Sequence, residues 1–190
     1  MVFFEHDGSS AGLIAAVSKI ILPLCLICNV AYGDESLEYK IKAAYLYNFT
    51  KFITWPENHA TTFNICIVGG DPFRKLLDNL ESKTAFDKPI RVFRYAHIKQ
   101  AKDCHIAYFD KIEDVTSISA PNSLIVGALP STLTVGSQPF FAESGGMIGF
   151  VLEQEKIKLH INLKALKLSG LEISAKLIEV STLVKEDEHE

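Results

Sequence analysis

The sequence lacks the short motifs that mark the most common classes of enzyme. It contains no G-x-S-x-G nucleophile elbow, no H-E-x-x-H metal-binding helix and no P-loop. It also lacks a cluster of Lys and Arg, and its formal net charge is -4, so a nucleic acid is not an expected partner. The sequence therefore predicts no catalytic residue, no metal and no cofactor.

Long hydrophobic runs are also missing. The apolar run after Lys19, IILPLCLICNVAYG, is too short to span a bilayer, which takes roughly 20 residues. It ends in Ala31-Tyr32-Gly33, with small residues where a signal peptidase requires them. We therefore expect residues 1–33 to be a signal peptide cleaved after Gly33, and residues 34–190 to be one exported domain. An uncleaved membrane anchor is the alternative.

Cysteine is scarce, with four in the chain. Cys25 and Cys28 lie within the expected signal, which leaves Cys66 and Cys104 as an even pair in an exported protein. Such a pair favours a disulfide, and closing the loop between them would stabilise the fold by about 4 kcal/mol in the chain-entropy model. The alternative is a metal site built from Cys66, Cys104, His105 and His160.

Strand-like and helix-like segments alternate after the expected signal. The strand-like runs are 62–69, 88–96, 104–110 and 123–129, and the helical patterns are 40–56, 71–81 and 111–120. This alternation implies βαβ units and a largely parallel sheet. The runs ICIV, IAYF and LIVG are apolar throughout, which is typical of strands covered on both faces. We expect an α/β fold, with three layers (α/β/α) around a mostly parallel central sheet.

The pattern changes after Gly136. Two strand-like runs, 147–152 and 156–161, flank Gln154-Glu155 and predict a C-terminal antiparallel hairpin. A short helix over 164–170 and a final helix over 172–184 are expected to follow. The stretch GGMIG leads into a strand rather than a helix, so we interpret it as a bulge or tight turn.

The first helix carries much aromatic and apolar surface. Its expected core-facing stripe is Ile41, Ala44, Tyr45, Asn48, Phe49 and Phe52, widened by Leu46 and Ile53. Asn48 is therefore expected to be a buried polar residue, which either bonds a nearby backbone carbonyl or lines a pocket. Tyr47 and Trp55 are aromatic residues that the core does not obviously need. Because aromatic residues are enriched at interfaces, the two are a candidate partner or dimer surface; packing at the sheet edge is the competing account.

A second candidate site is the turn VGGDPF, which joins a strand to the start of a helix. Ligands of open α/β sheets bind at this edge. Gly69, Gly70, Asp71 and Phe73 are therefore a candidate lip for a small ligand. The alternative is an ordinary turn in which Asp71 caps the helix.

Four sequence blocks resemble successive blocks of the YfiR family. They are IKAAYLYNFTKFITWP, FNICIVGGDPF, CHIAYF and GGMIGFVLEQEKIKLHINLKALKLSGLEISAKLIEV, and together they cover nearly all of residues 38–180. The family's structural disulfide matches Cys66 and Cys104. Some members carry a second cysteine pair near the glycine-rich block, but this chain has none between Gly145 and Val151.

The resemblance implies a small exported α/β protein that regulates without catalysis. The type member is a periplasmic repressor of YfiN, an inner-membrane diguanylate cyclase, and an outer-membrane protein can sequester it. By this resemblance, the expected partner is the periplasmic region of a membrane diguanylate cyclase or a similar receptor, and a homodimer is a further option. The alternative function is a periplasmic small-ligand-binding protein that signals to another membrane sensor.

Overall fold

The computed structural model describes residue 1 and residues 33–110 and 128–184. The chain divides into residues 1–36 and a compact unit of residues 37–190, and only the second is considered below. The predicted signal peptide, its cleavage after Gly33, the helix over 111–120 and most of the strand over 123–129 lie outside the described residues.

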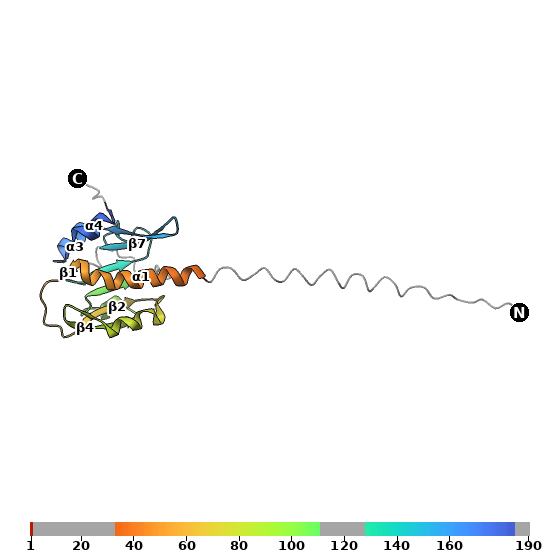
Figure 1. The fold of residues 1–190 in the computed structure, drawn as a ribbon, viewed down its shortest axis with the longest axis horizontal. Coiled ribbons are helices and arrows are strands. Elements are labelled where there is room, and N and C mark those ends of the chain that lie inside the picture. The colour runs from red at the N-terminus through yellow and green to blue at the C-terminus, as the bar shows by residue number, and fades with distance from the viewer. Residues whose placement is uncertain (2–32, 111–127, 185–190) are drawn as a thin grey trace. The chain divides into compact units, whose positions relative to one another are not determined.

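The compact unit is built on an eight-stranded sheet with the order β10-β8-β7-β6-β5-β2-β4-β3 (Figure 1). The strands are β2 (Phe63–Val68), β3 (Thr84–Ala85), β4 (Lys88–Tyr95), β5 (Ile106–Phe109), β6 (Leu133–Gly136), β7 (Ile148–Glu153), β8 (Lys156–Ile161) and β10 (Thr182–Leu183). β1 (Ile53–Thr54) and β9 (Glu172–Ile173) form a separate antiparallel pair. The helices are α1 (Gly33–Phe52), η1 (Arg74–Ser82), η2 (Ile98–Gln100), α3 (Leu163–Leu168) and α4 (Ala175–Glu179), with η marking 3-10 helices.

The predicted fold class is confirmed. The five strands from β4 to β7 in the sheet order pair in parallel, and β7 and β8 form the expected antiparallel hairpin. Gln154 and Glu155 make its two-residue turn with φ of 48° and 62°, which matches the backbone twist that such hairpins need.

The sheet is covered on both faces, as a three-layer arrangement requires. Along β2, Ile65 and Ile67 belong to the main core, whereas Cys66 and Val68 belong to a second, smaller cluster. This division follows from the alternation of side chains along a strand. α1 packs on the main core, and the second cluster includes residues beside η2 and the buried ring of Phe141.

The predicted core face of α1 was only partly right: Phe49, Leu46 and Ile53 are buried, and Tyr45 and Phe52 pack against the core. Ile41 and Ala44 are exposed and Asn48 is half-buried, while the buried apolar positions of the segment are Tyr39, Ala43, Leu46, Phe49 and Ile53. The true face also buries Lys42, which forms an ion pair with Glu38. Because this lysine interrupts the run of apolar residues on that face, the hydrophobic pattern did not identify it. In the observed orientation the amide of Asn48 is half-buried, and the buried ammonium of Lys42 is compensated by its ion pair with Glu38.

Other elements differ in type or length from those that the sequence predicted. The helix over 71–81 is the 3-10 helix η1, and β6 was not predicted. The final helix over 172–184 shrinks to α4, because Ile173 pairs with Ile53 and Leu183 pairs with Ile161. α3 was predicted correctly: the side chain of Asn162 accepts a hydrogen bond from the Ala165 N–H. No helix within the described residues is both long and apolar enough to cross a membrane.

Candidate functional site

A cavity of about 450 Å³ lies at the amino edge of the parallel strands. Phe63 opens β2, Lys88 opens β4 and His105 directly precedes β5. The loop that follows β1 closes the opposite side. The lining residues are Trp55, Pro56, Glu57, Asn58, His59, Phe63, Phe86, Lys88 and His105. We call this feature the Trp55 cavity.

Aromatic rings form the apolar wall of the Trp55 cavity. The ring of Trp55 lies edge-on to Phe63, with centroids 5.1 Å apart, and to Phe86, with centroids 5.7 Å apart. The indole N–H of Trp55 donates to the backbone oxygen of His105 over 2.9 Å. The indole is thus fixed in place by both packing and a hydrogen bond. Phe86 is less enclosed, with 49% of its surface exposed.

Three linked side chains form the polar wall. The ammonium of Lys88 donates to Asn58 Oδ1 over 2.8 Å, and Asn58 Nδ2 lies 3.0 Å from His105 Nε2. The backbone N–H of Asn64 donates to His105 Nδ1 over 3.1 Å. Burial lowers the pKa of His105, and the nearby positive charge of Lys88 lowers it further. The cavity therefore combines aromatic surface with the imidazole of His105, the ammonium of Lys88 and the carboxylate of Glu57.

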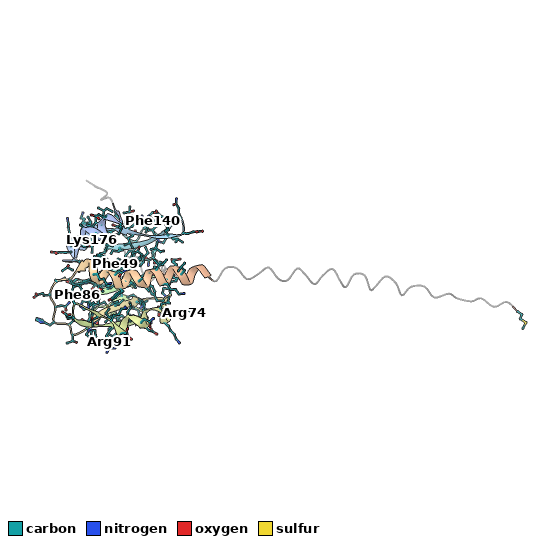
Figure 2. The ribbon with its side chains drawn as sticks, viewed as in Figure 1. Phe49, Arg74, Phe86, Arg91, Phe140 and Lys176 are labelled. Carbon is teal, nitrogen blue, oxygen red and sulfur yellow. A yellow bond between two sulfur atoms is a disulfide. The ribbon has the colours of Figure 1, made fainter. Side chains whose placement is uncertain are left out.

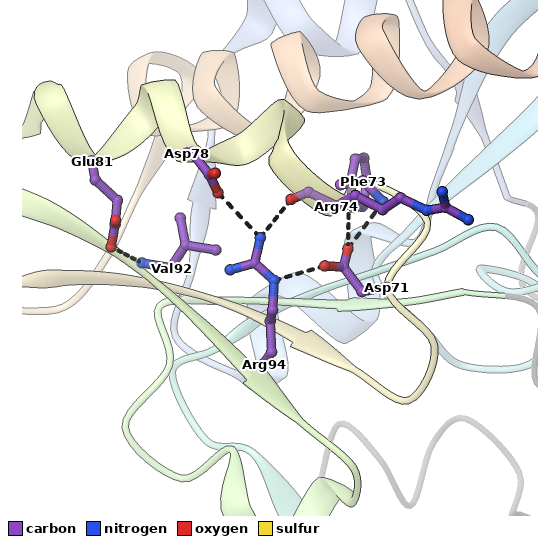
Figure 3. A network of polar contacts seen from close by, with 7 residues as sticks. All are labelled: Asp71, Phe73, Arg74, Asp78, Glu81, Val92 and Arg94. Atoms are coloured by element: carbon purple, nitrogen blue, oxygen red, sulfur yellow. Dashed lines mark hydrogen bonds and ion pairs between the residues drawn. The ribbon is translucent and has the colours of Figure 1, made fainter.

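The predicted ligand lip lies at the opposite edge of the sheet and does not line the Trp55 cavity. Asp71 Oδ1 accepts hydrogen bonds from the backbone N–H groups of Phe73 and Arg74, each over 3.0 Å. Its Oδ2 accepts from Arg94 Nε over 2.6 Å (Figure 3). Phe73 is 1% exposed and packs in the core. Asp71 thus closes a turn ahead of η1, whose N-cap is Phe73, and whether a ligand binds at this lip stays a prediction.

The two aromatic residues of the predicted partner surface are joined by one short segment. The ring of Tyr47 is half-buried between the ammonium groups of Lys51 and Lys83, at 4.7 and 4.8 Å from its centroid. Phe86, three residues after Lys83, lies against Trp55. Residues 83–86 therefore link the surroundings of Tyr47 to those of Trp55. Whether a partner binds there stays a prediction.

The predicted disulfide is present. Cys66 in β2 is bonded to Cys104, and their Cα atoms are 5.9 Å apart. The alternative metal site is not formed, because both thiols are used and His160 instead lies 2.7 Å from Glu143. No group of three or more potential metal-ligating side chains gathers within the described ranges.

Sequence reasoning missed most of the Trp55 cavity. Asn58, Phe86 and Lys88 were not singled out, and His105 was considered only as a metal ligand or a structural residue. These residues come from different segments and share no spacing that a motif could capture. Trp55 next to Pro56 was the one usable signal.

The sequence of this chain also matches a known protein family. A family model described as YfiR/HmsC-like matches residues 39–182. The chain belongs to this family. The match covers the strands of the main sheet from β2 to β8 and the whole Trp55 cavity.

Solved structures give a fold-level likeness to this YfiR/HmsC-like chain. A conserved domain protein from Vibrio cholerae O1 biovar El Tor shares 14% identity, with a TM-score of 0.52, over 77% of this chain and 60% of that one. An ABC domain in complex with L-Trp from Streptococcus pneumoniae shares 9% identity, with a TM-score of 0.48, over 73% of this chain and 59% of that one. The chain thus spans about three fifths of each structure. Comparison with curated proteins gives no match.

Proposed function

We propose that this chain is an exported, non-enzymatic regulator that binds the periplasmic region of an inner-membrane diguanylate cyclase and lowers cyclic-di-GMP. The observation that carries the proposal is the YfiR/HmsC-like match over residues 39–182, since this family is regulatory. The disulfide supports export, because such bonds persist in oxidising compartments. An outer-membrane protein that sequesters the regulator would complete the system, and a homodimer is compatible with it.

The partner surface in this proposal runs from Tyr47 to Trp55 through residues 83–86. Phe86 is its most exposed aromatic residue, at 49%, and it lies at the mouth of the Trp55 cavity. Trp55 has a structural role of its own, because its N–H bonds the backbone before β5. Phe86 is therefore a better test residue than Trp55, since replacing it removes accessible surface and no hydrogen bond formed by its side chain.

A binding experiment tests this surface. The periplasmic domains of the membrane cyclases of the source bacterium are purified one at a time and titrated with the exported protein. One domain should bind, and Phe86→Ala should weaken the complex about thirtyfold if Phe86 is an interface anchor worth about 2 kcal/mol. Phe140→Ala is the matched control, because Phe140 is 71% exposed but lies on another part of the molecule (Figure 2). Equal effects of the two substitutions would reject the surface, and no binding to any domain would reject the partner.

A second candidate function rests on the Trp55 cavity, whose volume of about 450 Å³ falls in the range of small-molecule sites. Its aromatic wall favours a planar ligand, and Lys88 favours an anionic group placed beside its ammonium and away from Glu57, which also lines the cavity. The chain contains one tryptophan, so Trp55 fluorescence reports on this cavity directly. The dye 1-anilinonaphthalene-8-sulfonate has the required chemistry and should quench Trp55. Lys88→Gln should weaken that quenching, and an unchanged titration would rule out the cavity as the dye site.

A further inference from the structure

The charge of this chain is unevenly distributed. Residues 88–102 contain five Lys and Arg and no Asp or Glu, whereas the whole chain has 19 Lys and Arg against 23 Asp and Glu. The rest of the chain thus has 14 basic and 23 acidic residues, a net charge of -9 against +5 in this segment. The sequence shows no dense basic cluster because these five residues are spread over β4, η2 and their flanks. Folding decides which of them share a surface.

Arg91, Phe93 and Tyr95 lie on one face of β4, because side chains alternate along a strand. This is the face of the disulfide, since Phe93 is the register partner of Cys66 in β2. The rings of Phe93 and Tyr95 are parallel within 2°, with centroids 6.0 Å apart. Phe93 is 36% exposed, so this aromatic pair is only partly covered.

The segment after β4, which carries Lys99 and Lys102, packs on the same side of the sheet. Ile98 and Ala101 pack against the smaller core cluster, which also contains Tyr95. Lys99 and Lys102 follow these two inward positions, and both are exposed. We define the β4 face as Arg91, Phe93, Tyr95, Lys99 and Lys102. Arg91 projects at the lower edge of the molecule in Figure 2.

The other two basic residues of the segment, Lys88 and Arg94, bond to partners outside the β4 face. Arg94 bonds Asp71 on the opposite face of the sheet (Figure 3), and Lys88 bonds Asn58 in the Trp55 cavity. Among the described residues, Arg91, Lys99 and Lys102 form no ion pair. Asp103, next to Lys102 in the chain, is the acidic residue closest to them in sequence. The β4 face thus presents three cations beside a partly exposed aromatic pair.

We propose that the β4 face docks the protein on an anionic lipid surface. Charge complementarity favours lipid, because lysine and arginine are attracted to anionic headgroups without a fixed geometry. Lysine, unlike the arginine and the aromatic residues of this face, is depleted at protein–protein interfaces. Tyrosine, the residue type of Tyr95, is enriched at the level of the lipid headgroups. Docking of this kind would place the regulator at the membrane that holds its receptor. The inference does not depend on the identity of that receptor.

The test uses the purified exported protein and sedimentation with vesicles. One set of vesicles is pure phosphatidylcholine, and the other is an equimolar mixture of phosphatidylcholine and phosphatidylglycerol. The protein should bind the mixed vesicles, and added salt should release it. The triple variant Arg91→Gln, Lys99→Gln, Lys102→Gln should bind on the order of a hundredfold more weakly, given the usual contribution of each basic residue near an anionic surface.

A matched control distinguishes the effect of the β4 face from the effect of the protein's net charge. The triple variant Lys156→Gln, Lys158→Gln, Lys167→Gln removes the same charge from exposed positions in β8 and α3, and it should bind like the wild type. All variants share one N-terminus, so any lipid affinity of that segment is common to them. Equal loss in both triple variants would overturn the proposal, as would binding that ignores phosphatidylglycerol. Loss of receptor binding in the β4-face variant without any vesicle binding would assign the face to a protein partner and would also overturn it.

Discussion

Two glycines that flank the ring of Phe141 provide the sharpest test of the packing. A Cβ atom added to Gly136 would meet the Phe141 ring well inside van der Waals contact, with Cγ at 2.5 Å. A Cβ atom added to Gly146 would meet the other side of the ring and also the Phe141 backbone oxygen, at 2.7 Å. Phe141 is 1% exposed, so its ring has little room to move. Each Gly→Ala substitution should therefore cost about 1–3 kcal/mol or more through overpacking.

The two glycines should respond differently when the ring is removed. Phe141→Ala should cost about 3–5 kcal/mol by itself. In that background Gly136→Ala should cost less, because the three atoms nearest to the added Cβ atom all belong to the ring. Gly146→Ala should stay costly, because the backbone oxygen remains in place. Urea denaturation of the single and double variants measures these couplings as a double-mutant cycle.

Gly149 provides the matched control. A Cβ atom there would have its nearest neighbour at 3.5 Å, the backbone nitrogen of Ala142, which is ordinary contact. Gly149→Ala should therefore be neutral, or stabilising by up to about 1 kcal/mol through the unfolded chain. If Gly136→Ala and Gly149→Ala melt alike, the described packing of Phe141 is wrong.

Three further predictions concern the disulfide, the turn and the buried histidine. Reduction of Cys66–Cys104, which closes a loop with a sequence separation of 38, should lower the free energy of unfolding by about 4 kcal/mol; a urea midpoint that does not move with reductant would contradict this. Asp71→Ala should cost about 1–2 kcal/mol by removing the acceptor that closes the turn and a partner of Arg94, yet leave Trp55 fluorescence unchanged; a spectral change would mean that the turn and the cavity are coupled. The pKa of His105 is lowered in the folded protein, so the unfolded chain binds more protons at this residue. The contribution of His105 to stability is therefore present above the ordinary histidine pKa of about 6.5 and is lost as the pH falls below that value. His105→Gln should flatten this part of the stability curve, and equal slopes would show that other groups titrate.

The fold could be predicted from the sequence because its central strands are apolar throughout. The runs around Cys66 and Tyr108 are buried along nearly their whole length, and short, continuously apolar runs of this kind are typical of parallel strands covered on both faces. The hairpin of β7 and β8 and the disulfide followed from local signals. β9 and β10 were missed because each has two residues, and their pairing depends on strands far away in the sequence.

The candidate site was only partly predictable. The core face of α1 was partly misassigned because Lys42 occupies a core position and is compensated by Glu38, a pairing that hydrophobic periodicity does not register. Trp55 was recognised, but its neighbour Phe86 was not, because a turn with a φ of 52° at Phe86 brings that ring to Trp55. Such contacts are set by tertiary packing and not by local pattern.

The central claim is that this chain restrains a membrane diguanylate cyclase, and the most direct measurement is the intracellular level of cyclic-di-GMP in cells that lack the gene. The account predicts that deletion raises this level and that the wild-type chain, expressed with its N-terminal segment, restores it. Phe86→Ala, checked first to melt like the wild type, should restore it less well than Phe140→Ala. A level of cyclic-di-GMP that does not change on deletion would contradict the account.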